Sequence, residues 1–203
     1  MPDTGAPWNI PYVAGTDLVS DWPTDSQALA NSIASGLTAA QGIIAVKHAL
    51  FTGTQTNSTA AGGNFAITSL SITHALSDAS NKLIISAFVG AAANSNNTNG
   101  VGLAVADDGT LIGIGDAASS RTRVSSGGAT FQSGADAGDG VSLVLTTQFV
   151  YAPGDTASHT YTARGINVAT GTETIYINRT EGDANGANRP RAASALVIQE
   201  VNV

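Results

Sequence analysis

The chain contains no cysteine among its 203 residues. Disulfides and thiolate metal sites are therefore excluded, so burial and contacts between subunits have to hold the fold together. Such a chain is suited to assembly in a reducing cytosol.

Basic residues are also scarce. Lys and Arg together number 8, against 15 for Asp and Glu, which gives a formal net charge of −7. A chain with so few cations offers no basic face that could neutralise phosphates. We therefore expect no nucleic-acid partner.

Long apolar runs are missing as well. No window approaches the roughly 18 apolar residues that a membrane span requires. The opening residues, "MPDTGAPWNI", have neither the basic start nor the apolar run of a secretory leader. The sequence predicts neither membrane insertion nor secretion by that route.

The composition of the chain is typical of strands. Apolar residues make up 42 %, which is enough for one packed core, and 23 glycines accompany abundant Thr, Ser and Asn. Charged residues, which surface helices carry, amount to only 11 %. This pattern indicates short strands joined by many turns, and it favours an all-β body with one appendage.

Residues 1–23 form the appendage. They hold four of the six prolines and both tryptophans of the chain, Trp8 and Trp22. Backbone rich in proline is extended and donates few ladder hydrogen bonds. We expect an extended N-terminal arm.

A short helix is predicted within the following segment, residues 24–41. Thr24 and Gln27 match a capping box, and Gly36 is a plausible stop. A helix of about eleven residues is marginal on its own in water, so it has to pack on something. Its apolar stripe consists of Leu29, Ile33 and Leu37. Either the β body or helices of neighbouring subunits would cover this stripe, and its narrowness favours the neighbouring subunits.

From residue 42 to residue 203 the apolar period is two, as in strands. Turn signals such as Asp108-Gly109 and Pro153-Gly154 separate the segments. We predict an antiparallel β-sandwich, jelly-roll-like, as the head domain. Its nine expected strands are 43–51, 64–72, 82–90, 101–106, 110–115, 141–151, 159–168, 173–178 and 194–203.

Sequence motifs for catalysis are weak. Residues 113–118 fit a dinucleotide fingerprint, but the segment that follows lacks the helical periodicity that the fingerprint needs. The three histidines, His48, His74 and His159, are far apart, and the carboxylates stand in turns with no pair placed for acid/base work. We expect no enzyme, no cofactor and no metal site.

A calcium loop is only partly matched. Glu181, Asp183, Asn185 and Gly186 occupy its first, third, fifth and sixth places, but Ala192 stands where a bidentate Glu is required. A looser calcium site, there or at Asp136 and Asp139, stays open as an alternative to ordinary turns.

Three long loops, residues 91–100, 116–140 and 179–193, carry most of the arginines. Loops of this length in a compact domain are usually functional or mobile. Paired guanidinium groups can grip a carboxylate or a phosphate of a ligand, although ion pairs with the abundant Asp are the favoured alternative. The candidate receptor-binding residues are Arg121, Arg123, Arg189 and Arg191.

Several motifs resemble those of tail fibre and minor tail proteins of tailed bacteriophages. The segment "PWNIPYVAGTDLVSDWPTDSQALANSIASGL" is similar to their N-terminal pattern P-W-x-I-P, then G-T-D-x-x-x-D, then an alanine-rich helix. "LSITHALSDASNKLIISAFVG", "YINRTEGD" and "SALVIQEVNV" resemble the heads of marine and cyanobacterial phage fibres.

The resemblance implies a homotrimeric virion protein, a short tail fibre that is assembled in the bacterial cytoplasm. Its β head would contact a glycan or protein of the host surface. Its arm would dock on another virion protein of the tail, baseplate or capsid. The docking residues would be Pro7, Trp8, Asn9, Ile10, Pro11, Tyr12, Asp17 and Trp22.

Three alternatives remain at this point. The protein could be a capsid or baseplate decoration fibre without a receptor role, a glycan-degrading enzyme on a fibre scaffold, or a free carbohydrate-binding module. An enzyme of that kind requires two carboxyl groups within about 10 Å of each other in one concave site.

Overall fold

The computed structural model describes residues 22–39, 42–93, 100–130, 142–187 and 189–203. The chain divides into two compact units, residues 1–44 with Asn202 and residues 45–201 with Val203. The proposed arm and its docking residues from Pro7 to Asp17 lie outside the described residues, as do Asp136 and Asp139. The division into arm, neck and head stays a prediction.

Helix α1 (Trp22–Ala39) is longer at both ends than the sequence predicts. It begins two residues before Thr24, and the Gln27 side chain does not turn back but donates to Asn31 Oδ1 at 2.9 Å. The predicted capping box and the stop at Gly36 are therefore wrong. Proline is tolerated in a first helical turn, so Pro23 permits the earlier start, and one glycine costs a helix only about 1 kcal/mol.

Among the described residues, no helix combines the length and the apolarity that crossing a membrane demands.

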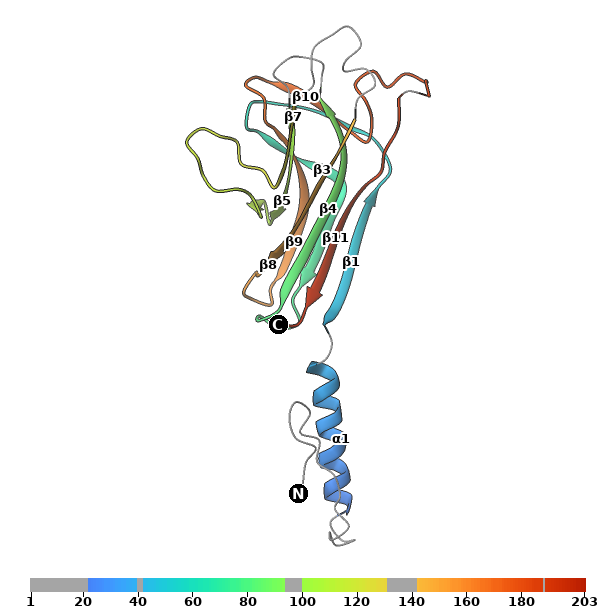
Figure 1. Ribbon diagram of the computed structural model, residues 1–203, viewed down its shortest axis with the longest axis vertical. Coiled ribbons are helices and arrows are strands. Elements are labelled where there is room, and N and C mark those ends of the chain that lie inside the picture. The colour runs from blue at the N-terminus through green and yellow to red at the C-terminus, as the bar shows by residue number, and fades with distance from the viewer. Residues whose placement is uncertain (1–21, 40–41, 94–99, 131–141, 188) are drawn as a thin grey trace. The chain divides into compact units, whose positions relative to one another are not determined.

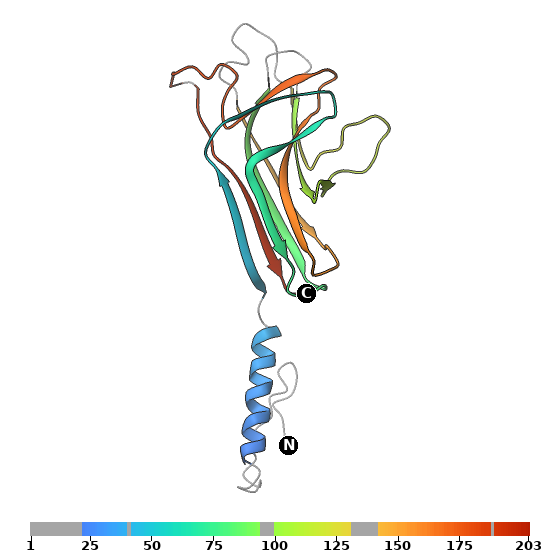
Figure 2. The ribbon, with the colours of Figure 1, turned by 180° about the vertical axis from the view of Figure 1, so that it is seen from behind.

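Eleven strands form two sheets in the described part of the chain (Figures 1 and 2). The first sheet contains β1 (Ile43–Phe51), β2 (Gln55–Thr59), β4 (Lys82–Ala93), β8 (Leu143–Tyr151), β10 (Glu173–Ile177) and β11 (Ser194–Val201). The second contains β3 (Asn64–Ala75), β5 (Gly100–Asp107), β6 (Thr110–Ile112), β7 (Ser126–Thr130) and β9 (Ser158–Asn167).

The pairing is nested along the chain. The first strands pair with the last, β1 with β11 and β2 with β10, and the next pairs inward are β3 with β9 and β4 with β8. The innermost strand β5 pairs with β6 and β7, which follow it. A long hairpin rolled into two sheets in this way is a jelly roll. The predicted antiparallel sandwich is confirmed.

The core lies between the two sheets. Along β8, Leu143, Leu145, Thr147, Phe149 and Tyr151 alternate with exposed residues, as the period of two predicts. The largest apolar side chains that are fully buried come from both sheets: Ile67, Leu70, Leu83, Ile85, Leu103, Tyr161, Ile166, Ile175, Ile177, Leu196 and Ile198.

Strands β2 and β7 were not predicted. Their sequences, "QTNST" and "SGGAT", carry no apolar alternation, so only backbone pairing with β10 and β5 defines them. The side chain of Gln55 in β2 also forms hydrogen bonds with the backbone of β3. The pairing of β3 with β9 shifts register there, between Ala66 and Ser71. The Gln55 side chain donates to the Ala66 carbonyl at 3.0 Å and accepts from Thr68 N–H at 2.7 Å, which satisfies backbone groups beside the bulge.

One buried carboxylate joins the two sheets. Glu200 in β11 is 2 % exposed and lies 2.9 Å from Nε2 of His74 in β3. Ser77 donates to it through its N–H and its hydroxyl, and Asn81 donates through its amide, at 2.7–2.8 Å. Burial alone would raise the pKa of Glu200, but these hydrogen bonds outweigh burial and lower the pKa to about 2.

The depressed pKa of Glu200 predicts a pH effect on stability. The ionised carboxylate stabilises the fold above its ordinary pKa of 4.5, and this contribution is lost as the pH falls toward 2. A shift of this size corresponds to a free energy on the order of 3 kcal/mol. The Glu200→Gln variant should be less stable than the wild type at pH 7 by that order, and the two curves of unfolding free energy against pH should converge toward pH 2.

Urea unfolding followed by circular dichroism at a series of pH values tests this expectation. Glu181→Gln, which changes a carboxylate outside this cluster, is the control and should follow the wild-type curve. Parallel curves for wild type and Glu200→Gln would contradict the assignment.

Candidate functional site

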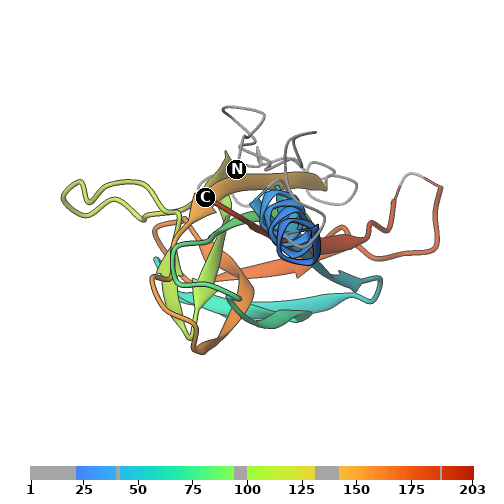
Figure 3. The same cartoon turned by 90° about the horizontal axis from the view of Figure 1, so that it is seen from below.

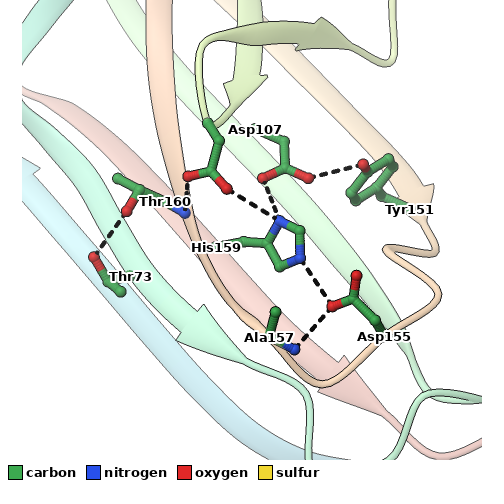
Figure 4. Close-up of polar contacts among 8 residues, drawn as sticks. Thr73, Asp107, Tyr151, Asp155, Ala157, His159 and Thr160 are labelled. Atoms are coloured by element: carbon green, nitrogen blue, oxygen red, sulfur yellow. Dashed lines mark hydrogen bonds and ion pairs between the residues drawn. The ribbon is translucent and has the colours of Figure 1, made fainter.

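A histidine-centred cluster lies where strands β5, β8 and β9 approach one another (Figure 4). Asp107 is the last residue of β5, Asp108 follows it in the turn to β6, and Tyr151 is the last residue of β8. Asp155 stands between β8 and β9, and His159 is the second residue of β9.

The strand pairing explains why these residues meet. Strands β5 and β9 are antiparallel with Asp107 opposite Tyr161, so the end of β5 lies beside the beginning of β9. Asp108 and Gly109 both have positive φ, 45° and 91°, as a two-residue turn of type I′ requires. The turn directs Asp108 back onto β9, where its Oδ1 accepts from Thr160 N–H at 2.9 Å.

Both ring nitrogens of His159 face carboxylates. Nδ1 lies 2.9 Å from Asp107 Oδ1 and 3.4 Å from Asp108 Oδ2, and Nε2 lies 3.1 Å from Asp155 Oδ1. The Tyr151 hydroxyl donates to Asp107 Oδ2 at 2.8 Å, which joins the two sheets. The side chains of Asp107 and His159 are 8 % and 19 % exposed, whereas those of Asp108 and Asp155 are more than half exposed.

The carboxylates set the charge of the cluster. The hydrogen bond to Asp155 raises the pKa of His159 against the opposing effect of burial, and Asp107 adds to the increase. The same bond lowers the pKa of Asp155. Burial, followed by the bond to Asp107, raises the pKa of Tyr151 to about 12, and burial raises that of Tyr161 further still. Both tyrosines therefore stay protonated.

This cluster was not predicted from the sequence, which shows no pair of carboxylates placed for acid/base work. Asp107 and Asp108 place oxygens around one ring nitrogen although His159 is about fifty residues away in sequence. The signal that could have revealed it is the Asp-Asp pair at the end of one predicted strand and the histidine at the start of another. It becomes informative only once those two strands are known to be antiparallel neighbours.

The predicted arginines lie on two loops that project from opposite sides of the sandwich (Figure 3). Arg121 and Arg123 belong to the connection between β6 and β7. Arg121 lines a hollow of about 540 Å³ together with Gly62 and Ala169. Arg123 Nε donates to the Gly115 carbonyl at 2.6 Å. Strand β6 ends at Ile112, and residues 113–118 follow it without a helix, so they do not form a dinucleotide loop.

Arg189 and Arg191 line a second hollow of about 300 Å³ with Asp183. Arg191 Nη2 donates to both oxygens of Asp183 at 3.0 Å, and Arg179 Nη1 lies 3.5 Å from the same carboxylate. The ion-pair alternative therefore holds for Arg191. Two guanidinium groups beside Asp183 also disfavour a calcium ion in this loop.

The residues of the predicted stripe all fall within helix α1. Leu29, Ile33 and Leu37 all belong to α1 at four-residue intervals, and Trp22 is its first residue. Leu29 is half-buried and Ile33 is 43 % exposed. Covering of this stripe by other copies stays a prediction.

No protein-family model matches this chain, and no curated protein matches it. A solved structure of infectious bursal disease virus, Gx strain, is similar, with 13 % sequence identity and a TM-score of 0.37. The match covers 79 % of this chain and 39 % of that one, so the chain spans about two fifths of the length of the viral protein. A similarity of this size concerns the fold and says nothing of function.

The link from Tyr151 to Asp107 predicts a measurable contribution to stability. Tyr151→Phe removes the hydroxyl that joins the sheets and leaves a buried carboxylate oxygen without its donor, which should cost about 1–2 kcal/mol of unfolding free energy. Tyr176→Phe is a matched control because the Tyr176 hydroxyl forms no hydrogen bond with any of the described residues. Equal stability of the two variants by urea unfolding would show that the link contributes nothing.

Proposed function

We propose that this protein is a structural component of a virus particle of the tailed-bacteriophage type and that it assembles as a homotrimer. The observation that carries the proposal is the outer face of the first sheet, formed by the outward residues of β1, β11, β4 and β8. Several of its apolar side chains are strongly exposed: Val46 at 57 %, Leu50 at 58 %, Phe88 at 47 %, Val144 at 69 % and Val150 at 62 %.

This surface, here called the apolar face, is nearly free of charge. Lys82, at the start of β4, is the one Lys, Arg, Asp or Glu among its outward residues in the described strands. The other members are Ile44, Val46, His48, Leu50, Ile84, Ser86, Phe88, Val144, Thr146, Gln148, Val150, Ala195, Val197, Gln199 and Val201.

The outer face of the second sheet is polar by contrast. Hydroxyl pairs cross from β3 to β9, Ser71 with Thr162 at 3.0 Å and Thr73 with Thr160 at 3.2 Å. This difference between the two sheets indicates that the outer face of the second sheet is exposed to solvent and that the outer face of the first sheet contacts a protein partner.

A second copy of the chain is the occupant that the charge favours. Copies that each carry a net charge of −7 repel one another wherever acidic surfaces meet, so contact is least costly where charge is absent. The four strands lie about 4.8 Å apart, and the face covers a length of about seven residues along each strand, which gives an area of roughly 400 Å². This is about half of the ~800 Å² that each partner contributes to a standard interface, and the stripe of α1 offers further contact.

The remaining parts of the proposal rest on the resemblance to phage fibres. The arm, with Trp8, Ile10, Tyr12 and Trp22, would dock on another virion protein, and the loops with Arg121 and Arg123 would meet a host glycan or protein. Three copies of a weak sugar site would gain by avidity. In the loop of residues 179–193, Arg191 already donates to Asp183, so fewer of its N–H groups are available to a ligand.

The enzyme alternative is less well supported. A two-carboxylate glycosidase keeps its carboxyl groups at least about 5 Å apart with sugar between them. The Asp107 and Asp155 carboxylates lie on opposite sides of the His159 ring, at 2.9 Å and 3.1 Å from its two nitrogens, so the imidazole occupies the space that a sugar would need. We therefore favour a non-catalytic protein.

The role of the apolar face can be tested by adding charge to it. Val144→Lys/Val150→Lys places two cations on exposed positions of β8, where they leave the core intact but must lose water when copies meet. We expect a wild-type trimer in sedimentation velocity and association weakened by about 100-fold or more in this variant.

Ala79→Lys/Thr172→Lys is the control, since it adds the same charge at exposed positions off the face. This control should stay trimeric. A folded wild-type monomer at micromolar concentration, or equal weakening of both variants, would refute the proposed interface.

Membership of a particle needs a separate measurement. Virions purified from an infected culture that expresses this chain should contain it in a fixed ratio to the major capsid protein, with a copy number divisible by three. Quantitative mass spectrometry gives that ratio. A chain found only in the soluble lysate would contradict the virion role while leaving the trimer untouched.

A further inference from the structure

Three donor atoms converge at the end of strand β5. His159 Nδ1, Asp107 Oδ1 and Asp108 Oδ2 all lie within 4.8 Å of one another, and the nitrogen is 2.9 and 3.4 Å from the two oxygens. Ligands bound to one metal ion at about 2.0–2.2 Å are separated by roughly 2.9–3.5 Å, the edge of a tetrahedron or octahedron. Small adjustments would thus admit an ion at the centre.

A proton satisfies this arrangement less completely than a metal ion does. Nδ1 can carry one proton, and that proton bonds well to one oxygen only, which leaves Asp108 Oδ2 at 3.4 Å, beyond good hydrogen-bond distance. A divalent cation in place of this proton would bind both carboxylates and the ring nitrogen at once.

Each of the three ligands is already oriented by an outer partner. Tyr151 holds the second oxygen of Asp107, and the Thr160 N–H holds that of Asp108. Asp155, itself fixed by the Ala157 N–H, accepts from Nε2 of His159 (Figure 4). A carboxylate behind a histidine and donors behind carboxylates are the outer contacts that orient metal ligands in proteins.

The charge of the cluster also calls for a cation. Three carboxylates surround one imidazole, and within the described part of the chain no Lys or Arg forms an ion pair with any of them. The nitrogen donor distinguishes the set from an all-oxygen calcium site, since imidazole with carboxylates suits Zn²⁺ and its neighbours.

We infer that Asp107, Asp108 and His159 form a binding site for a divalent transition-metal ion, with Zn²⁺ as the best fit. Water would complete the coordination because the Asp108 side chain is 58 % exposed. The ion would tie the β5–β6 turn to β9 and, through Tyr151, to the other sheet. Its role would therefore be to stabilise the sandwich.

Calorimetric titration of the full-length chain, freed of metal with EDTA, tests the site. We expect one Zn²⁺ per chain with a dissociation constant in the micromolar range, no comparable heat from Ca²⁺, and a melting temperature raised by saturating Zn²⁺. Co²⁺ should give visible absorption bands that disappear when Zn²⁺ is added.

Two variants and one control locate the ion. Asp108→Asn, at an exposed position that the fold tolerates, should weaken Zn²⁺ binding at least tenfold, and His159→Gln should abolish the cobalt spectrum. Asp116→Asn, which removes an exposed carboxylate outside the cluster and outside the apolar face, should change neither. Lack of binding at millimolar Zn²⁺, or binding as tight in Asp108→Asn and His159→Gln as in the wild type, would overturn the assignment.

Discussion

The pairing of each early strand with a late one around a single core is the constraint from which the other features follow. Because β1 and β2 pair with β11 and β10, and β3 and β4 with β9 and β8, each of the first four strands needs a partner from the later part of the chain. The same nesting gives each sheet one buried face and one outer face. It also brings the end of β5 against the start of β9, where the histidine cluster forms.

Polar contacts between the sheets add specificity to this arrangement. Glu200 reaches from β11 to His74 of β3, and Tyr151 reaches from β8 to Asp107 of β5. Both contacts bury a carboxylate, and a buried charge is tolerated only in the register that provides all its donors. They therefore favour one alignment of the sheets over others that apolar packing alone would allow.

Much of the sandwich could be predicted from the sequence because its strands alternate. The nine predicted segments all contain strands, because apolar side chains at every second position are typical of strands, and β1 has the predicted bounds. The polar strands β2 and β7 lack this pattern. The start of α1 was misplaced because Thr24 and Gln27 imitate a cap, although Pro23 already suits a first turn.

Sites made by long-range pairing were the hardest to foresee. Asp107 and His159 are typical turn and strand residues when each is taken alone, and only the antiparallel register joins them. The arginine pairs were visible as short motifs, but sequence spacing could not tell that Asp183 holds Arg191 or that the two loops project apart.

The central claim is that copies of this chain meet through the apolar face of β1, β11, β4 and β8. Electron cryo-microscopy of the purified full-length protein tests it most directly, because the map shows what covers that face. We predict a particle with threefold symmetry in which Val144, Val150 and Phe88 of each copy lie against another copy. A map in which these three side chains point into solvent in every copy would contradict the claim.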